Sequence, residues 1–270
     1  LLKTKNENRK THFTYFGRSK SAVLIDAIKQ IFQKKSRGKF LDDNLPKLID
    51  KSEKFIYFPL GIDEEHSLLI GAPYFTNQIE TIRHVAKSIP IDYKLYVKEH
   101  PSSVTRNWKS ISDYKQIMDI PNVKLVHHSI SKDELFDNCS LVISAMGSSG
   151  LDAAFYGKPS IVFGEMFYTI LPSVTYVEKL NDLPNTIRSS LQNTVRLEDV
   201  KKFLAIFYKN SFDFDINRYM LDEANTFFHN GQLVDVEISD TQMKSFIENN
   251  SDMFSILVKE HIKRINELNV

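Results

Sequence analysis

The amino-acid sequence predicts an α/β protein with an open, mainly parallel sheet and helical flanks. Strand-like and helix-like segments alternate between residues 55 and 193, which is typical of a parallel sheet covered by helices on both faces. The run Leu141–Ile143 is apolar without alternation, and so is nearly all of Ser160–Phe163, as expected of strands buried on both sides. Prolines and glycines such as Pro90 and Gly157 mark where segments end.

The elements follow one another in a regular order, and we expect five or six strands between residues 55 and 177. The clearest strands are 55–60, 93–99, 123–126, 141–143 and 160–163. The helices between them are 79–89, 110–119, a short one that starts in the capping box Ser131–Glu134, and 151–156.

The two ends of the chain have a different pattern, so we divide it into three parts. Residues 1–50 are an amino-terminal flank or linker with one helix near 21–34, 51–195 the α/β domain, and 196–270 a helical extension. The last helix carries an apolar stripe that we interpret as core packing: Val258, Ile262, Ile265 and Leu268. Because the chain starts at Leu1 and not at methionine, we interpret it as a piece of a longer polypeptide.

The composition excludes some classes of function. The chain has 270 residues and a net charge of +1, so nothing global indicates nucleic acid as a partner. No apolar run approaches the roughly 18 residues of a membrane span, and no signal peptide opens the chain. Cys139 is the one cysteine, which excludes an intrachain disulfide and fits a reducing compartment such as the cytoplasm.

Two unusual loops follow strands of the predicted sheet, "KEHP" at 98–101 and "SAMGSSG" at 144–150. The carboxyl ends of parallel strands lie on one edge of a sheet, where ligands bind in open α/β folds. We therefore expect His100 and the turn at 147–150 to face a common pocket.

The glycine–serine turn has the chemistry of an anion site. Gly147 and Gly150 allow a tight backbone, while Ser148 and Ser149 add hydroxyl donors before a helix start, which suits a phosphate. The alternative is an ordinary turn in which a serine only caps the helix. The turn is not a Walker loop or a GxGxxG motif, and Leu151 stands where a nucleophile elbow needs glycine.

His100 has two interpretations, a surface histidine or a donor to a phosphate oxygen. Pro101 restricts its backbone, and Lys98 can add positive charge. Glu99 alternates with them and is expected to point to the other face with a structural role. The adjacent His127 and His128 point apart on an extended chain, so we expect no metal site there.

These blocks together resemble the capsule polysaccharide biosynthesis family, which includes bacterial Kdo transferases. The resemblance runs from Phe55 to Val177 and is carried by "FIYFPL", "YKLYVKEHP", "IPNVKLV", "SAMGSSGLDAAFYGKPSIVFG" and "EMFYTILPSV". It implies a GT-B glycosyltransferase, in which two Rossmann-like domains face each other across a cleft. These blocks belong to the carboxyl-terminal domain, which binds the nucleotide sugar.

Carried over residue by residue, His100 and Pro101 match the family's His-Pro motif at the donor phosphate. Gly147, Ser148, Ser149 and Gly150 match its Gly-Thr-Ala-Gly-type turn, with serines in place of threonine and alanine. Glu165 stands where relatives often have aspartate or asparagine and would touch the ribose or the sugar. The resemblance thus gives His100 and Glu165 as candidate catalytic residues, and Lys98 joins the phosphate-binding set.

The expected function is donor binding in a glycosyltransferase of surface polysaccharide synthesis. The implied partners are a CMP- or UDP-linked sugar donor and a glycan or glycolipid acceptor, with no cofactor and no metal. The expected location is the cytoplasm, and a peripheral position at the inner face of the cell membrane, beside polysaccharide assembly machinery, is an alternative. The alternatives are a polyol-phosphate transferase of the teichoic-acid type and a non-catalytic nucleotide-sugar-binding module. Because a GT-B site is assembled between two domains, we expect this piece alone to bind a nucleotide without transferring sugar.

Overall fold

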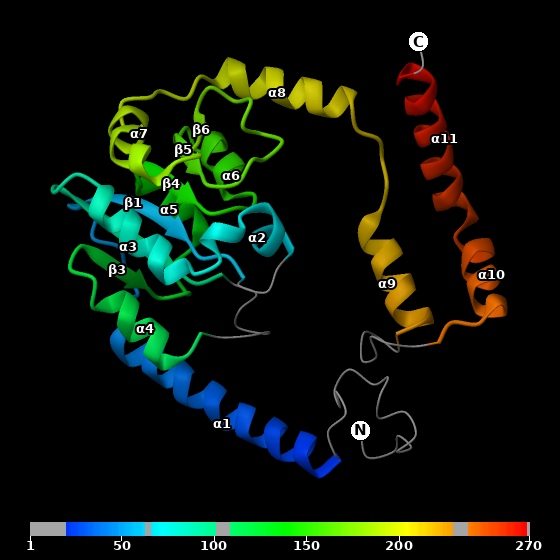
Figure 1. Ribbon diagram of the computed structural model, residues 1–270, viewed down its shortest axis with the longest axis horizontal. Coiled ribbons are helices and arrows are strands. Elements are labelled where there is room, and N and C mark those ends of the chain that lie inside the picture. The colour runs from blue at the N-terminus through cyan, green and yellow to red at the C-terminus, as the bar shows by residue number, and fades with distance from the viewer. Residues whose placement is uncertain (1–19, 63–65, 101–108, 229–236, 269–270) are drawn as a thin grey trace. The chain divides into compact units, whose positions relative to one another are not determined.

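A computed structural model describes residues 20–62, 66–100, 109–228 and 237–268 of the chain (Figure 1). The chain divides into two compact units. The α/β unit comprises residues 34–207, and the helical unit comprises 208–270 together with 1–33. The α/β unit contains the range 51–195 that the sequence assigns to the nucleotide-sugar-binding domain, and helix α1 (Lys20–Asn44) crosses the boundary between the two units.

The sheet of the α/β unit has six strands, and every pair of neighbours is parallel, which confirms the predicted class. The strands are β1 (Lys54–Pro59), β2 (Tyr93–Lys98), β3 (Val123–Val126), β4 (Leu141–Ser144), β5 (Ser160–Val162) and β6 (Val174–Tyr176). Their order across the sheet is β3-β2-β1-β4-β5-β6. This is the order of a Rossmann-type doubly wound sheet.

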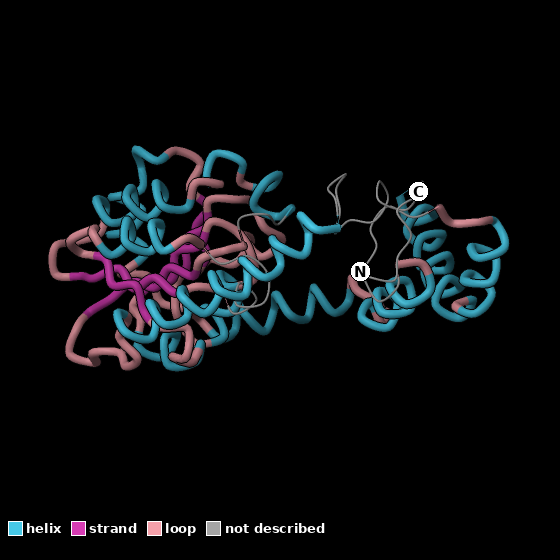
Figure 2. The backbone as a smooth tube through the Cα atoms, turned by 90° about the horizontal axis from the view of Figure 1, so that it is seen from below, coloured by secondary structure: helices cyan, strands magenta, loops and turns pink. Residues whose placement is uncertain are grey.

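Helices cover both faces of this sheet, and Figure 2 shows the strands as a layer between them. The helices of the α/β unit are α2 (His66–Gly71), α3 (Gln78–Ser88), α4 (Ile111–Met118), α5 (Lys132–Asn138), α6 (Ser149–Phe155), α7 (Leu183–Ser190) and α8 (Leu197–Lys209), with 3-10 turns η2 (Pro73–Phe75) and η4 (Leu180–Asp182). The cores on the two faces use alternate residues of one strand. Leu95 and Val97 of β2 pack with α3, α4 and α7, and Tyr96 packs with α5 and α6.

Local sequence signals set several helix starts. The Asn77 side chain accepts a hydrogen bond from the N–H of Glu80 and begins α3, and Ser131 accepts one from Glu134 and begins α5. Such caps satisfy backbone donors that have no partner inside the helix. Helix α1 is longer than the expected 21–34 and extends to Asn44, because its last turns bury Leu41 in the core of the α/β unit.

The helical unit contains α9 (Ile216–Thr226), α10 (Asp240–Asn249) and α11 (Ser251–Leu268). Its described aromatic side chains gather where these helices meet: Tyr219 contacts Phe246 and Phe254, and Phe246 also packs on Phe227. The expectation that the apolar stripe of α11 is core packing is wrong in this structure. Its members are largely exposed: Val258 57%, Ile262 53%, Ile265 55% and Leu268 85%. Among the residues that the structure describes, the first turn of α11 contacts the aromatic cluster through Phe254, and the stripe beyond it is exposed.

Candidate functional site

The strand order places a topological switch point between β1 and β4, because the chain builds the sheet outward in opposite directions from these two strands. In such sheets the carboxyl ends beside the switch point leave a crevice where ligands bind. The register puts Pro59 of β1 opposite Lys98 of β2, and Tyr57 of β1 opposite Val142 of β4. The loops after β1, β2 and β4 are therefore neighbours on one edge.

A pocket lies at this edge, and we call it the switch-point pocket. It encloses about 90 Å³ and is lined by the carboxyl ends of β1 and β4, by residues that follow β1, β2 and β4, and by Leu68 of α2. From β1 and the segment after it come Pro59–Ile62, after β2 comes His100, and from the end of β4 and the turn after it come Ser144–Ser149. The structure thus brings His100 together with Gly147, Ser148 and Ser149 in one pocket.

An adjoining pocket of about 160 Å³ shares Pro59, Leu60, His100, Ser148 and Ser149 with the first. Its charged lining residues are two lysines, Lys98 and Lys132, and two carboxylates, Glu99 and Asp152; we call it the lysine pocket. Both volumes are well below the roughly 300–1,000 Å³ of a site that holds an entire small-molecule ligand. They suit a fragment such as a phosphate group.

The turn after β4 is held in a shape that only glycine takes easily at its first position. Gly147 has φ 110°, a left-handed conformation that side chains disfavour. The Tyr168 hydroxyl donates to the Gly147 carbonyl, and the Ser144 hydroxyl donates to the carbonyl of Met146 at 2.8 Å. Burial raises the pKa of the Tyr168 phenol to about 12, so it remains a hydrogen-bond donor at neutral pH.

Gly150 is needed for packing and not for its backbone angle. A Cβ at this position would lie 2.9 Å from the ring and hydroxyl of Tyr168 and 3.0 Å from Val162. The Gly150 carbonyl also accepts a hydrogen bond of 2.9 Å from the Ser160 hydroxyl. Gly150 is buried behind the pocket and brings the start of α6 against β5.

Ser148 occupies the N-cap position of α6, yet its side chain makes no capping hydrogen bond. The alternative of an ordinary serine cap is therefore wrong for Ser148. Its hydroxyl is 3.5 Å from Oδ2 of Asp152, and both Ser148 and Ser149 line the two pockets. Both serines thus lie at the pockets that His100 also lines.

The three residues at the tip of β2 have different surroundings. Lys98 is 5% exposed, and its ammonium donates to the carbonyl of Ile130 at 2.5 Å. Burial lowers the pKa of Lys98. Glu99 is buried near Tyr114, whose pKa is raised first by burial and then by the Glu99 carboxylate. His100 is half-buried and lines both pockets.

The remaining predicted residues are not part of this group. Pro101 lies outside the described residues. Glu165 is exposed after β5, on the same sheet edge, but it is not among the residues that line the switch-point pocket or the lysine pocket. His127 and His128 lie side by side with ring centres 4.0 Å apart, and Nε2 of His127 is 3.4 Å from Asp42. Within the part of the chain that the structure describes, no three His, Cys, Asp or Glu side chains are placed to hold a metal ion.

The sequence alone did not indicate several residues that line these pockets, among them Leu60, Ile62, Lys132 and Asp152. Leu60 and Ile62 follow β1. Their place at a ligand pocket follows from the position of β1 beside the switch point, which the strand order shows. Lys132 carried a weak signal in the sequence, because it opens a helix, where the macrodipole disfavours a cation.

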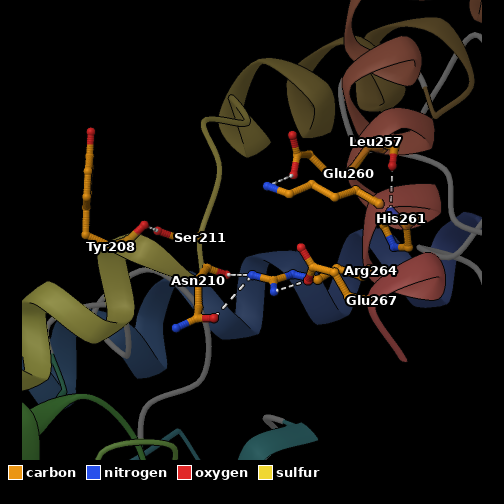
Figure 3. Close-up of polar contacts among 9 residues, drawn as sticks. Tyr208, Asn210, Ser211, Leu257, Glu260, His261, Arg264 and Glu267 are labelled. Atoms are coloured by element: carbon orange, nitrogen blue, oxygen red, sulfur yellow. Dashed lines mark hydrogen bonds and ion pairs between the residues drawn. The ribbon is translucent and has the colours of Figure 1, made fainter. Parts of the chain in front are cut away.

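The helical unit has a pocket of its own, lined by segment 209–212 and by α11. Arg264 pairs with Glu267 at 2.7 Å and reaches the Asn210 side chain at 3.3 Å, as Figure 3 shows. Lys263 lies 3.8 Å from Glu260. Lys263 is thus paired with Glu260 and Arg264 with Glu267, and the pocket carries none of the residues predicted for the site.

No helix among the described residues is both long enough and apolar enough to cross a membrane.

Comparison with known proteins gives one family match. The model of the family described as "Capsule polysaccharide biosynthesis protein" matches residues 7–205. That range includes all six strands of the sheet, the switch-point pocket and the lysine pocket. A search of curated proteins returns no match.

Solved structures with low identity also align with the chain. KpsC of Thermosulfurimonas dismutans, a beta Kdo 2,7 transferase, is 17% identical with a TM-score of 0.39, covering 58% of this chain and 47% of that one. The UDP-GlcNAc 2-epimerase of Methanocaldococcus jannaschii is 14% identical with a TM-score of 0.42 (63% and 48%). The S. aureus MnaA–UDP structure is 14% identical with a TM-score of 0.40 (56% and 41%). The match spans less than half the length of each of these chains.

Proposed function

The chain belongs to the capsule polysaccharide biosynthesis family, and from this premise we propose that its α/β unit binds the nucleotide-sugar donor of a GT-B glycosyltransferase in surface polysaccharide synthesis. One observation carries the proposal. His100 and residues 147–149 line a single pocket at the switch point of a Rossmann-type sheet, where nucleotides bind in folds of this kind.

The pocket has the donors that a phosphate needs. His100, Ser148 and Ser149 line it, and their imidazole and hydroxyl groups can donate hydrogen bonds to a phosphate. Hydrogen bonds to a charged phosphate are shorter and stronger than those between neutral groups. A site that is built from two rigid strand ends also holds these donors without reorganisation when the ligand enters.

The same donors serve the chemistry of transfer. When a sugar leaves a nucleotide, the bond between its anomeric carbon and the phosphate oxygen breaks, and the electron pair stays on that oxygen. An acceptor hydroxyl supplies the new bond to the carbon and loses its proton. Donors aimed at the leaving phosphate stabilise the charge that grows there, and this is the role that we propose for His100.

The proposed donor is linked to CMP or UDP, and the acceptor is a glycan or glycolipid. In a GT-B enzyme the acceptor and the catalytic base belong largely to a facing domain. Glu165, exposed after β5 on the carboxyl edge, is proposed to contact the ribose or the sugar. Pro101 is proposed to fix the backbone of His100.

The test is nucleotide binding by the wild type and by His100→Ala, measured calorimetrically with CMP, UDP and CDP. Loss of a hydrogen bond to a charged phosphate costs roughly 1.5–3 kcal/mol, so we expect the dissociation constant of the preferred nucleotide to rise about 10- to 100-fold. His84→Ala, on the exposed side of α3, is the matched control and should bind as the wild type does. Equal binding by His100→Ala and the wild type for every nucleotide would contradict the proposal.

A further inference from the structure

Two lysines line the lysine pocket, but their ammonium groups have different partners. Lys98 is buried, and its ammonium donates to the Ile130 carbonyl. Lys132 is the first residue of α5, its side chain is 52% exposed, and Nζ is 2.8 Å from Oδ2 of Asp152. Of the two, Lys132 is better placed to meet a ligand, because its ammonium donates to the Asp152 side chain at the pocket and not to the backbone of the core.

Asp152 links Lys132 to the glycine–serine turn. Asp152 lies in the first turn of α6, where its Oδ2 also lies 3.5 Å from the Ser148 hydroxyl. Lys132, Asp152 and Ser148 therefore form a chain of polar contacts across the pocket from α5 to the turn. The Lys132 ammonium lies 5.6 Å from the centre of the Phe136 ring, which limits the directions its side chain can take.

We propose that Lys132 is a further ligand of the donor phosphate and that Asp152 positions it. An ammonium group has three hydrogens, so it can donate to Asp152 and to a phosphate oxygen at the same time. This inference rests on the proposed function, and it names Lys132 and not Lys98 as the cation of the site. Lys98 instead ties the tip of β2 to the backbone after β3.

The position of Lys132 supports this role. A cation in the first turn of a helix is opposed by the helix macrodipole, so Lys132 does not stabilise α5. A half-exposed ion pair such as Lys132–Asp152 adds little to stability. The pair therefore offers little to the fold, while it places a positive charge at the wall of the lysine pocket, beside His100, Ser148 and Ser149.

The experiment compares Lys132→Ala and Lys132→Gln with the wild type, using the full chain and the nucleotides CMP, UDP and CDP. We expect the dissociation constant to rise about three- to tenfold, as for loss of a partly solvated charge-assisted contact. Binding should also depend less steeply on salt in both variants. Lys132→Arg keeps the charge and should retain more of the affinity than Lys132→Gln.

Two controls separate a phosphate contact from a structural effect. Cytidine and uridine lack the phosphate, so their weaker binding should be the same in Lys132→Ala and in the wild type. Lys158→Ala removes a lysine that donates to the Asp137 carbonyl at 2.9 Å and lines neither pocket; this variant should bind nucleotides normally.

The outcomes distinguish the two proposals. If His100→Ala loses affinity while both Lys132 variants bind nucleotides as the wild type does, the role of Lys132 is refuted and the proposed function stands. Equal loss of nucleotide and nucleoside affinity would also refute it, because the effect would not involve the phosphate. A wild type that binds no nucleotide would overturn both.

Discussion

The α/β unit and the helical unit contain amphipathic helices of similar pattern, but only the first unit buries their apolar faces. In α3, Ile82 and Val85 are fully buried against the sheet. In α11, Ile262 and Ile265 have the same spacing of apolar residues along the helix, yet each is more than half exposed. An apolar stripe along a helix indicates a face that can be buried. Whether that face is buried depends on a continuous apolar surface against which the helix can pack.

The sheet is that partner surface in the α/β unit. Its strands alternate side chains between two cores, and each core extends across several strands and helices. The described helical unit buries three apolar side chains, Phe227, Phe246 and Met253. We infer that the stability of the protein resides mainly in the unit that also holds the candidate site, which gives the site a rigid support.

The largest expected effect tests this contrast directly. Ile143→Ala in β4 removes a side chain that is 0% exposed and should destabilise the α/β unit by about 2–5 kcal/mol. Ile262→Ala in α11 makes the same chemical change at an exposed position and should stay within about 0.5 kcal/mol. Urea denaturation followed by circular dichroism measures both. Similar losses in the two variants would show that the α11 stripe is covered in solution.

A smaller effect is expected at the turn of the site. Gly150→Ala places a methyl group 2.9 Å from Tyr168 and should cost about 1–3 kcal/mol through overpacking. Gly38→Ala is the matched control, since Gly38 lies in α1 with no atom within 4 Å of the new Cβ. That control should gain about 0.5–1 kcal/mol. Thermal unfolding of both variants checks the prediction, and a Gly150→Ala protein as stable as the wild type would disprove the close packing at α6.

The smallest effect concerns pH. Burial lowers the pKa of His127 and of His128 from the usual 6.5. Repulsion by His128 lowers the pKa of His127 further, while the Asp42 carboxylate raises both pKa values in part. Below pH 6.5 the unfolded chain therefore binds more protons than the folded one, so stability falls as pH drops from 6.5 through the folded-state values. The melting temperature of the wild type should be lower at pH 5.5 than at pH 7.5.

Asparagine at both positions, His127→Asn with His128→Asn, should weaken that pH dependence. His261→Asn in the helical unit replaces an exposed histidine and should leave the dependence unchanged. If His261→Asn removes as much of the dependence as the double variant does, the buried pair is not its source.

The sequence predicts the α/β class, the parallel sheet and most element positions, because uninterrupted apolar runs and caps such as Ser131 are local signals. It also indicates two donor-bearing loops on one sheet edge. The strand order is not a local property, so the position of Leu60 beside the switch point could not be derived. The different roles of Lys98 and Lys132 could not be derived from the sequence either. The Lys98 ammonium donates to the Ile130 carbonyl, and the position of that carbonyl depends on the folded backbone.

The central claim is that a nucleotide binds at the switch point of the α/β unit, and hydrogen–deuterium exchange of the full chain tests it most directly. With saturating CMP, UDP or CDP, we expect slower exchange in peptides that cover 59–62 and 144–152, which contain residues that line the switch-point pocket and the lysine pocket. Peptides from α10 and α11 should exchange at the same rate with and without nucleotide. Slower exchange in α11 with none in 144–152 would contradict the account and move the binding site to the helical unit.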